Sequence, residues 1–331
     1  MKKFIDEKGT FEISVPATWK YTLKDGKIHT FQEYQIWKSD AFQISIHDLD
    51  TEEKKDNFLS NCKTLQKKIV GEKEYFSLPN SDSGDFKVNS WMAMYDSKMV
   101  IFTFTNPVNP DSDLDSRTMD EKTTLAESCI KSFNLIDDTY SKSKINSYRF
   151  EMFLQGVGAT SLILSNAISN KAFIEATCIL ASQIDALLRT GIILRNQIDN
   201  NNSDIEVEWI YQGISDKKKS EKDIYNKALN LGIIDQTTFD ELYILYDDRN
   251  RVIHRFIISE ITLAEVEEIA YKYYEKSKSI NKIIYDLESE QIKNKVGMTR
   301  TGENNDEDSS FNFIKGKIGI NEYFEKSRID E

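Results

Sequence analysis

Proline is scarce in this sequence and confined to its first third. The 331 residues contain four prolines, at positions 16, 79, 107 and 110, and none follows. Because proline interrupts helix interiors, this distribution separates a first part that can hold strands and turns from a remainder that can be helical. The length favours two domains and a tail over a single core.

Cysteine and histidine are also rare. Cys62, Cys129 and Cys178 are odd in number and widely spaced, without a C-x-x-C pair. Neither a disulfide framework nor a zinc site is therefore expected. His29 and His47 have no metal-like neighbours in sequence and are expected to be exposed or satisfied strand residues. We expect no metal and no cofactor.

Positive charge and long apolar runs are lacking as well. The formal net charge is −12, which argues against a general nucleic-acid or anionic-membrane coat and leaves room only for a local basic site. No apolar run approaches the roughly 20 residues that cross a bilayer. The N-terminus becomes charged before a signal-peptide core could form. A cytoplasmic protein without a membrane contact is expected.

The first part of the chain has the alternation of apolar and polar residues that is typical of strands. Residues 51–69 and 119–133 have helical spacing instead, and Asp96-Ser97 lies between two strand-like runs and predicts a hairpin turn. These features predict an antiparallel α+β domain over residues 1–138. The expected strands are 10–15, 29–38, 41–48, 74–78, 85–95 and 99–106.

This pattern resembles the PsbP-like fold, named after an extrinsic photosystem subunit. The resemblance rests on the opening run Gly9–Trp19, on the central antiparallel strands and on the closing run Ile130–Ile136. It covers residues 1–138 and implies no enzymatic activity. Domains of this kind usually bind a partner, so the resemblance implies a sensing or adaptor role.

The second part predicts an all-α bundle over residues 145–293, reached through a polar linker at 139–147. Helices are expected over 145–168 and 171–198, with Asn170 as a boundary cap. A short helix is expected from Ser220 to Leu231-Gly232, and a further helix from Asp235 or Thr237 carries the sequence Asp247–Arg255. The last helix begins at the capping box Thr262–Glu265. Residues 294–331 form a polar tail that is either disordered or a docking arm.

The sequence Asp247–Arg255 holds the chemistry of the helical half. Asn250 and His254 are four residues apart and share one stripe of a helix, while Arg249 lies about 100° round with a side chain long enough to reach them. A histidine exchanges protons near neutral pH, and a guanidinium binds phosphate through two parallel hydrogen bonds. This combination suits RNA chemistry.

The helical half resembles the HEPN superfamily, whose name abbreviates "higher eukaryotes and prokaryotes nucleotide-binding". The resemblance rests on Arg249-Asn250-x-x-x-His254, which meets the family motif in full, and on Asp185, which matches an acidic or polar position on the earlier helix loosely. Family members with this motif are typically metal-independent endoribonucleases that act as symmetric dimers. They recur as toxins, in antiviral defence and among CRISPR-associated effectors.

The resemblance implies a role for each motif residue. His254 is the general acid or base, Arg249 stabilises the transition-state charge and Asn250 orients the phosphate. Arg251 and Arg255 are auxiliary charges. Some toxins of the family carry a tyrosine two residues after the histidine, which a partner enzyme modifies; Phe256 occupies that position here, so this neutralisation is not expected.

The implied function is an RNA-cleaving effector in bacterial antiphage defence or toxicity. Its expected partners are RNA, a second copy of the chain, and a regulatory protein or phage-derived trigger at the N-terminal domain. Two alternatives stay open: a non-catalytic HEPN scaffold that binds a nucleotide or protein, and an adaptor whose bundle only dimerises. The cations could also simply complement a helix C-terminus and pair with Asp247 and Asp248.

Overall fold

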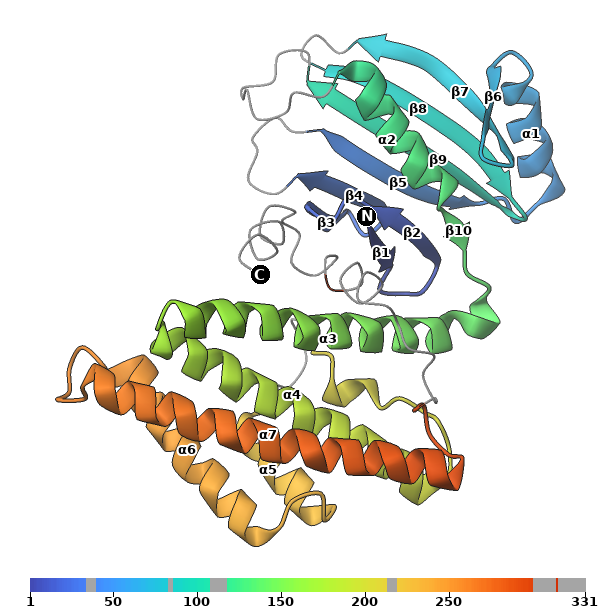
Figure 1. The fold of residues 1–331 in the computed structure, drawn as a ribbon. Helices are drawn as coiled ribbons and strands as arrows, with labels where there is room; N and C mark the ends of the chain where they lie inside the picture. Colours follow the sequence, from blue (N-terminus) through green and yellow to red (C-terminus); the bar gives the residue numbers. More distant parts are fainter. Residues whose placement is uncertain (34–39, 83–85, 108–117, 213–218, 300–313, 315–331) are drawn as a thin grey trace. The chain divides into compact units, whose positions relative to one another are not determined.

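The computed structural model describes residues 1–33, 40–82, 86–107, 118–212, 219–299 and residue 314. The chain separates into two compact units whose boundary lies at Lys142–Ser143 (Figure 1). The first unit is an antiparallel α+β domain and the second is helical, as the sequence predicts. Of the predicted tail, residues 300–313 and 315–331 lie outside the described residues, and Ile314 packs against Gly158.

The first unit is built on a seven-stranded antiparallel sheet in the order β3-β4-β5-β9-β8-β7-β6, beside a small sheet in the order β1-β2-β10. The hairpin predicted at Asp96-Ser97 joins β8 to β9. The large sheet comprises β3 (Trp19–Lys24), β4 (Ile28–Glu33), β5 (Ala41–Asp48), β6 (Gln66–Val70), β7 (Lys73–Asp82), β8 (Phe86–Tyr95) and β9 (Lys98–Pro107); the small sheet comprises β1 (Lys2–Ile5), β2 (Phe11–Val15) and β10 (Asn134–Leu135).

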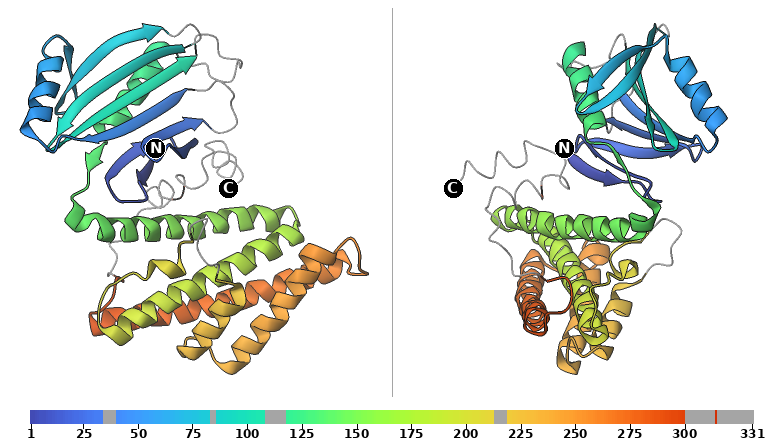
Figure 2. Two further views of the ribbon diagram at one scale, coloured as in Figure 1. Left: turned by 180° about the vertical axis from the view of Figure 1, so that it is seen from behind. Right: turned by 90° about the vertical axis from the view of Figure 1, so that its right-hand side faces the viewer.

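Two helices cover opposite faces of the large sheet (Figure 2). Helix α2 (Met119–Lys131) contributes Cys129 and Ile130 to the main core, where aromatic residues of the central strands are fully buried. Helix α1 (Glu52–Cys62) packs through Phe58 and Cys62 against a second, smaller cluster. The period-2 alternation of the central strands produces both faces, because successive side chains point to opposite sides.

Two boundaries differ from the sequence-based prediction. The helix predicted over 51–69 ends at Cys62, because Gln66–Val70 forms β6 and pairs with β7 through a turn at Gly71, whose φ is +66°. Residues 139–147, predicted to be a linker, belong to α3, which begins at Asp138. Asp137 accepts a hydrogen bond from the Thr139 N–H at 2.8 Å, which satisfies one of the free amides at this helix end.

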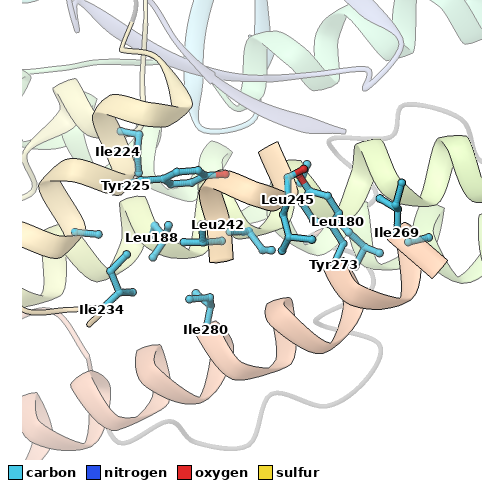
Figure 3. Packing of buried hydrophobic residues seen from close by; sticks show 14 of the residues in the cluster. Leu180, Leu188, Ile224, Tyr225, Ile234, Leu242, Leu245, Ile269, Tyr273 and Ile280 are labelled. Carbon is cyan, nitrogen blue, oxygen red and sulfur yellow. The ribbon is translucent and has the colours of Figure 1, made fainter. Parts of the chain in front are cut away.

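The second unit centres on α4 (Phe173–Asn200) packed along α7 (Leu263–Asn294). Helices α5 (Glu221–Asn230) and α6 (Gln236–Arg255) complete its core, drawn in Figure 3. The two long helices approach closely at Gly191, where an added Cβ would lie 2.9 Å from Ile284 Cδ1. The predicted α7 stripe is buried as expected: Val266, Ile269, Tyr273, Ile280, Ile284 and Leu287.

Helix ends were predicted well where a side chain caps them. Ser220 and Thr262 form capping boxes, Asp235 caps α6, and Gly232 follows α5 with φ +65°. Asn170 is not the N-cap of α4: that position is Ala172, without a side-chain bond, and Asn170 donates to the Asn166 carbonyl at the end of α3.

Two helices have the length and composition of membrane-spanning segments, which the sequence analysis does not expect and which alone does not show that either helix spans a membrane. Helices α3 (Asp138–Ser169) and α4 are both long and apolar enough by length and composition. In α4, 56% of the most apolar 18-residue stretch is buried inside the protein, as in core helices of soluble proteins. In α3, the buried share of the corresponding stretch is 17%.

Candidate functional site

The site residues lie on the last two turns of α6. This helix is anchored at its start by Asp235, whose carboxylate accepts the Thr238 N–H at 2.8 Å. Leu242, Leu245 and Val252 form its buried face, at the spacing that a 3.6-residue period brings to one side. The sequence Arg249–His254 therefore belongs to a helix whose orientation is fixed by core packing.

Arg249 lies at the border of this buried face and is held by an ion pair. Its Nη2 donates to Glu221 Oε2 at 2.8 Å, and its guanidinium carbon lies 5.0 Å from the ring centre of Tyr246. The side chains of Arg249 and Glu221 are only 20% and 14% exposed. A charged hydrogen bond at this burial is stronger than one at the surface. The guanidinium therefore has one preferred position.

The carboxylate of Glu221 also accepts a second hydrogen bond. The Tyr225 hydroxyl donates to Glu221 Oε1 at 2.6 Å. Burial raises the pKa of the Tyr225 hydroxyl well above its usual range, and the Glu221 carboxylate raises it further. Tyr225 therefore stays a neutral donor. Both oxygens of Glu221 are thus engaged, which fixes the carboxylate under Arg249.

His254 and Asn250 face another direction. His254 lies five positions after Arg249, which corresponds to about 140° around a helix of 3.6 residues per turn. Helical side chains lean toward the N-terminus, and Arg249 accordingly lies over Tyr246, away from the turn that carries His254. His254 is exposed and Asn250 is partly exposed. Within one chain, the guanidinium is therefore not brought to the imidazole.

The three predicted auxiliary residues do not contact Arg249. Arg251 is half-exposed and pairs with Asp248 at 3.2 Å, and more loosely with Glu265 at 4.0 Å. Arg255 is exposed, and its carbonyl accepts the Ser259 hydroxyl at 2.7 Å.

Asp185 binds an arginine of its own helix instead. Its Oδ2 accepts from Arg189 Nε at 2.6 Å, and Arg189 also donates to the Trp209 carbonyl at 2.6 Å. The carboxylate that serves Arg249 is therefore Glu221 on α5, which the sequence analysis missed. The Ser220 capping box shows that Glu221 begins a helix, but only the packing of α5 on α6 places it beside Arg249.

Uncovered apolar side chains surround the exposed end of α6. Ile257 and Ile258, in the turn that follows the helix, are 94% and 80% exposed. Ile253 and Leu263 are also exposed, and the four side chains flank His254 in sequence. Exposed apolar side chains that lie this close together in sequence make the end of α6 a candidate interaction surface.

The first unit holds a cavity of about 270 Å³ at one end of its strands. Tyr21 and His29 line it, and the Tyr21 hydroxyl lies 3.0 Å from His29 Nδ1. Burial lowers the pKa of His29 and raises that of Tyr21 to about 12. His29 is therefore a satisfied strand histidine, as expected, and His47 is an exposed one, 3.2 Å from Ser45 Oγ. Within the described ranges, no cluster of three or more His, Cys, Asp or Glu is placed to hold a metal ion.

The solved structures that resemble this chain include two of low similarity. A crystal structure from Bacteroides thetaiotaomicron is 16% identical to this chain in sequence, with a TM-score of 0.33. The matched region covers 56% of this chain and 76% of the Bacteroides chain. The solution structure of cyanobacterial PsbP (CyanoP) from Synechocystis sp. PCC 6803 is 13% identical with a TM-score of 0.29, and covers 41% of this chain and 92% of its own. At these TM-scores neither likeness assigns a function. No family model and no curated protein matches the chain.

Proposed function

We propose that the helical unit is a metal-independent endoribonuclease of the HEPN type, which acts as a homodimer in the cytoplasm in bacterial antiphage defence or as a toxin. The observation that carries this proposal is that, on α6, Arg249 is held by an ion pair while His254 is exposed to solvent. Arg249 is fixed by Glu221 at 2.8 Å, while His254 is exposed on the next turns beside uncovered apolar side chains. The PsbP-like N-terminal unit is a sensing or adaptor domain for a regulatory protein or a phage-derived trigger.

The reaction uses the three motif residues in distinct roles. The ribose 2′-oxygen attacks the adjacent phosphorus, and His254 of one chain takes the hydroxyl proton or protonates the leaving 5′-oxygen. The guanidinium of Arg249 stabilises the charge that develops on the phosphoryl oxygens, and Asn250 orients the phosphate. The products are a 2′,3′-cyclic phosphate and a 5′-hydroxyl.

A second copy of the chain completes the site in this proposal. Because Arg249 and His254 diverge within one chain, the arginine of one protomer serves the histidine of the other. A twofold interface presents the same patch from both sides, so Ile257 and Ile258 would be covered by their own symmetry mates.

Cleavage in the presence of EDTA tests the proposal. Purified wild type, Arg249→Ala and His254→Ala are incubated with RNA, and Arg251→Ala serves as a matched control, because Arg251 is half-exposed and paired elsewhere. We expect Arg249→Ala and His254→Ala each to lose roughly 100-fold or more of the cleavage rate, and Arg251→Ala to stay near wild type. Equal rates for the wild type and both motif variants would reject the enzyme.

Mixing the two inactive variants tests the shared site. If each site takes Arg249 from one chain and His254 from the other, a mixed dimer of Arg249→Ala and His254→Ala keeps one intact site of two. Random reassociation then restores about a quarter of wild-type activity. A mixture as inactive as its components would contradict the shared site.

Ile257→Glu, which places a charge in the interface, should convert the dimer to a monomer in sedimentation velocity.

A second function has an observation of its own. The ion pair to Glu221 occupies one edge of the Arg249 guanidinium, as expected of a residue with a structural role. A non-catalytic HEPN scaffold that binds a nucleotide or protein partner would show this pair without RNA cleavage. Retention of partner binding by His254→Ala, together with an inactive wild type, would favour the scaffold.

A further inference from the structure

One face of α6 aligns two aromatic rings with the exposed residues of the motif. Tyr243, Tyr246, Asn250 and His254 follow each other at intervals of three, four and four residues, which keeps them on one side of the helix. They span about 16 Å of helix axis at 1.5 Å per residue. The rings are partly exposed, so the face continues from the motif toward the middle of the helix.

Cations lie over these rings. The Lys222 ammonium of α5 lies 4.8 Å from the ring centre of Tyr243 and 4.5 Å from that of Tyr246. The Arg249 guanidinium lies over the same Tyr246 ring. Lys222 forms no ion pair with any carboxylate in the part of the chain that the structure describes. In a protein of net charge −12, an ammonium without an ion pair beside two partly buried aromatic rings is a local site for an anion that also carries aromatic bases.

We infer that Tyr243, Tyr246 and Lys222 form a track that binds single-stranded RNA and leads it to Arg249, Asn250 and His254. This inference rests on the proposed function and names the form of its substrate. Alternation of cations and rings matches a chain of phosphates and bases, because bases stack on aromatic side chains and phosphates bind ammonium groups.

Single-stranded RNA fits this face better than a duplex. The rings can stack only on bases whose flat faces are free, and in a duplex those faces are stacked on neighbouring base pairs. Lys222 has a long flexible side chain, so its ammonium can leave the rings for a phosphate while a base takes its place. The track then supplies one or two stacked bases and at least one phosphate contact before the cleavage site.

Binding is measured with the full-length chain in a His254→Ala background, which separates binding from cleavage. Fluorescence anisotropy with a labelled single-stranded RNA, in EDTA and at several salt concentrations, is compared with the same RNA annealed into a duplex. Lys222→Ala, Tyr246→Leu and Tyr246→Phe are introduced into this background. Lys278→Ala is the matched control, since its ammonium also lies over a tyrosine, 5.3 Å from the Tyr274 ring centre, but on α7 and paired with Glu275.

We expect the single strand to bind more tightly than the duplex. Lys222→Ala should reduce the slope of log affinity against log salt by about 0.7, the value for one phosphate contact on a single strand. Tyr246→Leu should weaken binding roughly 5- to 100-fold, Tyr246→Phe should restore it because the ring is kept, and Lys278→Ala should change nothing. Thermal melts verify that each variant is folded.

Three results would overturn the track: equal binding of duplex and single strand, unchanged binding by Lys222→Ala and Tyr246→Leu, or no RNA binding at all. The outcome is distinguishable from that of the proposed function. A wild type that binds single strands through Lys222 and Tyr246 but never cleaves them keeps the track and rejects the enzyme. A wild type that cleaves RNA with no dependence on these two residues keeps the enzyme and rejects the track.

Discussion

The ion pair between Glu221 and Arg249 makes a quantitative prediction about the stability of the helical unit. Glu221→Gln keeps the size of the side chain and one acceptor oxygen but removes the charge that faces Arg249. A half-buried guanidinium then loses a charged hydrogen bond, worth about 1.5–3 kcal/mol. Since both side chains retain some exposure, 20% and 14%, we expect a cost near the middle of that range, about 2 kcal/mol.

A double-mutant cycle isolates this interaction from other effects of the substitutions. Glu221→Gln, Arg249→Met and the double variant are unfolded in urea and followed by far-ultraviolet circular dichroism, which reports mainly on the helices. The single variants should each lose about 2 kcal/mol, and the double variant should lose less than their sum by roughly 1.5–2 kcal/mol. In thermal unfolding, each single change should lower Tm by about 4–8 °C for a unit of this size.

The refuting result is a coupling free energy below about 0.5 kcal/mol, which is the level at which independent sites already add. Arg251→Met is the control, because its guanidinium is half-exposed and its ion pairs are at the surface, at 3.2 and 4.0 Å. It should change the free energy of unfolding by no more than about 0.5 kcal/mol. A small coupling would mean that Glu221 does not fix Arg249.

Three further predictions concern packing, capping and pH. Gly191→Val places a branched side chain against Ile284, where even a Cβ would lie 2.9 Å away, and should destabilise the helical unit by roughly 1–3 kcal/mol in urea unfolding, while Gly232→Ala tests only backbone strain. Thr262→Ala removes the cap of α7 and should cost about 1 kcal/mol; an unchanged free energy would contradict the capping box. His29 has a pKa lowered by burial, so the folded state binds its proton less readily than the unfolded state. Stability of the first unit should therefore fall as pH drops below about 6.5, the unfolded value, and His29→Phe should flatten this dependence in thermal melts between pH 7 and 5.

Local chemistry explains which parts of the fold were predictable. The ends of α5, α6 and α7 follow from Ser220, Asp235 and Thr262, because a capping side chain bonds to amides within three residues of itself. The buried stripe of α7 follows from its near-heptad spacing for the same reason: the period is a property of one helix. Neither feature depends on what packs against it.

The errors occur where a distant segment decides the structure. Residues 66–70 were predicted to continue a helix, but they become β6 because β7 offers a complete antiparallel ladder from Gln66 to Val70. Polar residues 139–147 were predicted to be a linker, although they form the first turns of α3. A helix can carry polar residues on all sides when its later turns are anchored by packing, and the apolar period is then absent from its start.

The candidate site combines both situations. The sequence alone places Arg249, Asn250 and His254 on one helix, because the spacing of a motif within a helix is local. It does not identify Glu221 or Lys222, which come from α5 and reach the α6 face only through tertiary packing. The loosely matched Asp185 pairs with Arg189 at 2.6 Å, whereas the carboxylate that pairs with Arg249 is Glu221.

These contacts suggest why α5 matters to the proposed chemistry. The first turn of this helix presents Glu221 to Arg249 and Lys222 to Tyr243 and Tyr246, so one short element both orients the guanidinium and completes the cationic track. Its start is fixed by the Ser220 capping box and its underside by the buried Tyr225. Any perturbation that loosens this turn would therefore disturb the arginine and the track together, whereas His254, carried by α6 alone, would keep its place.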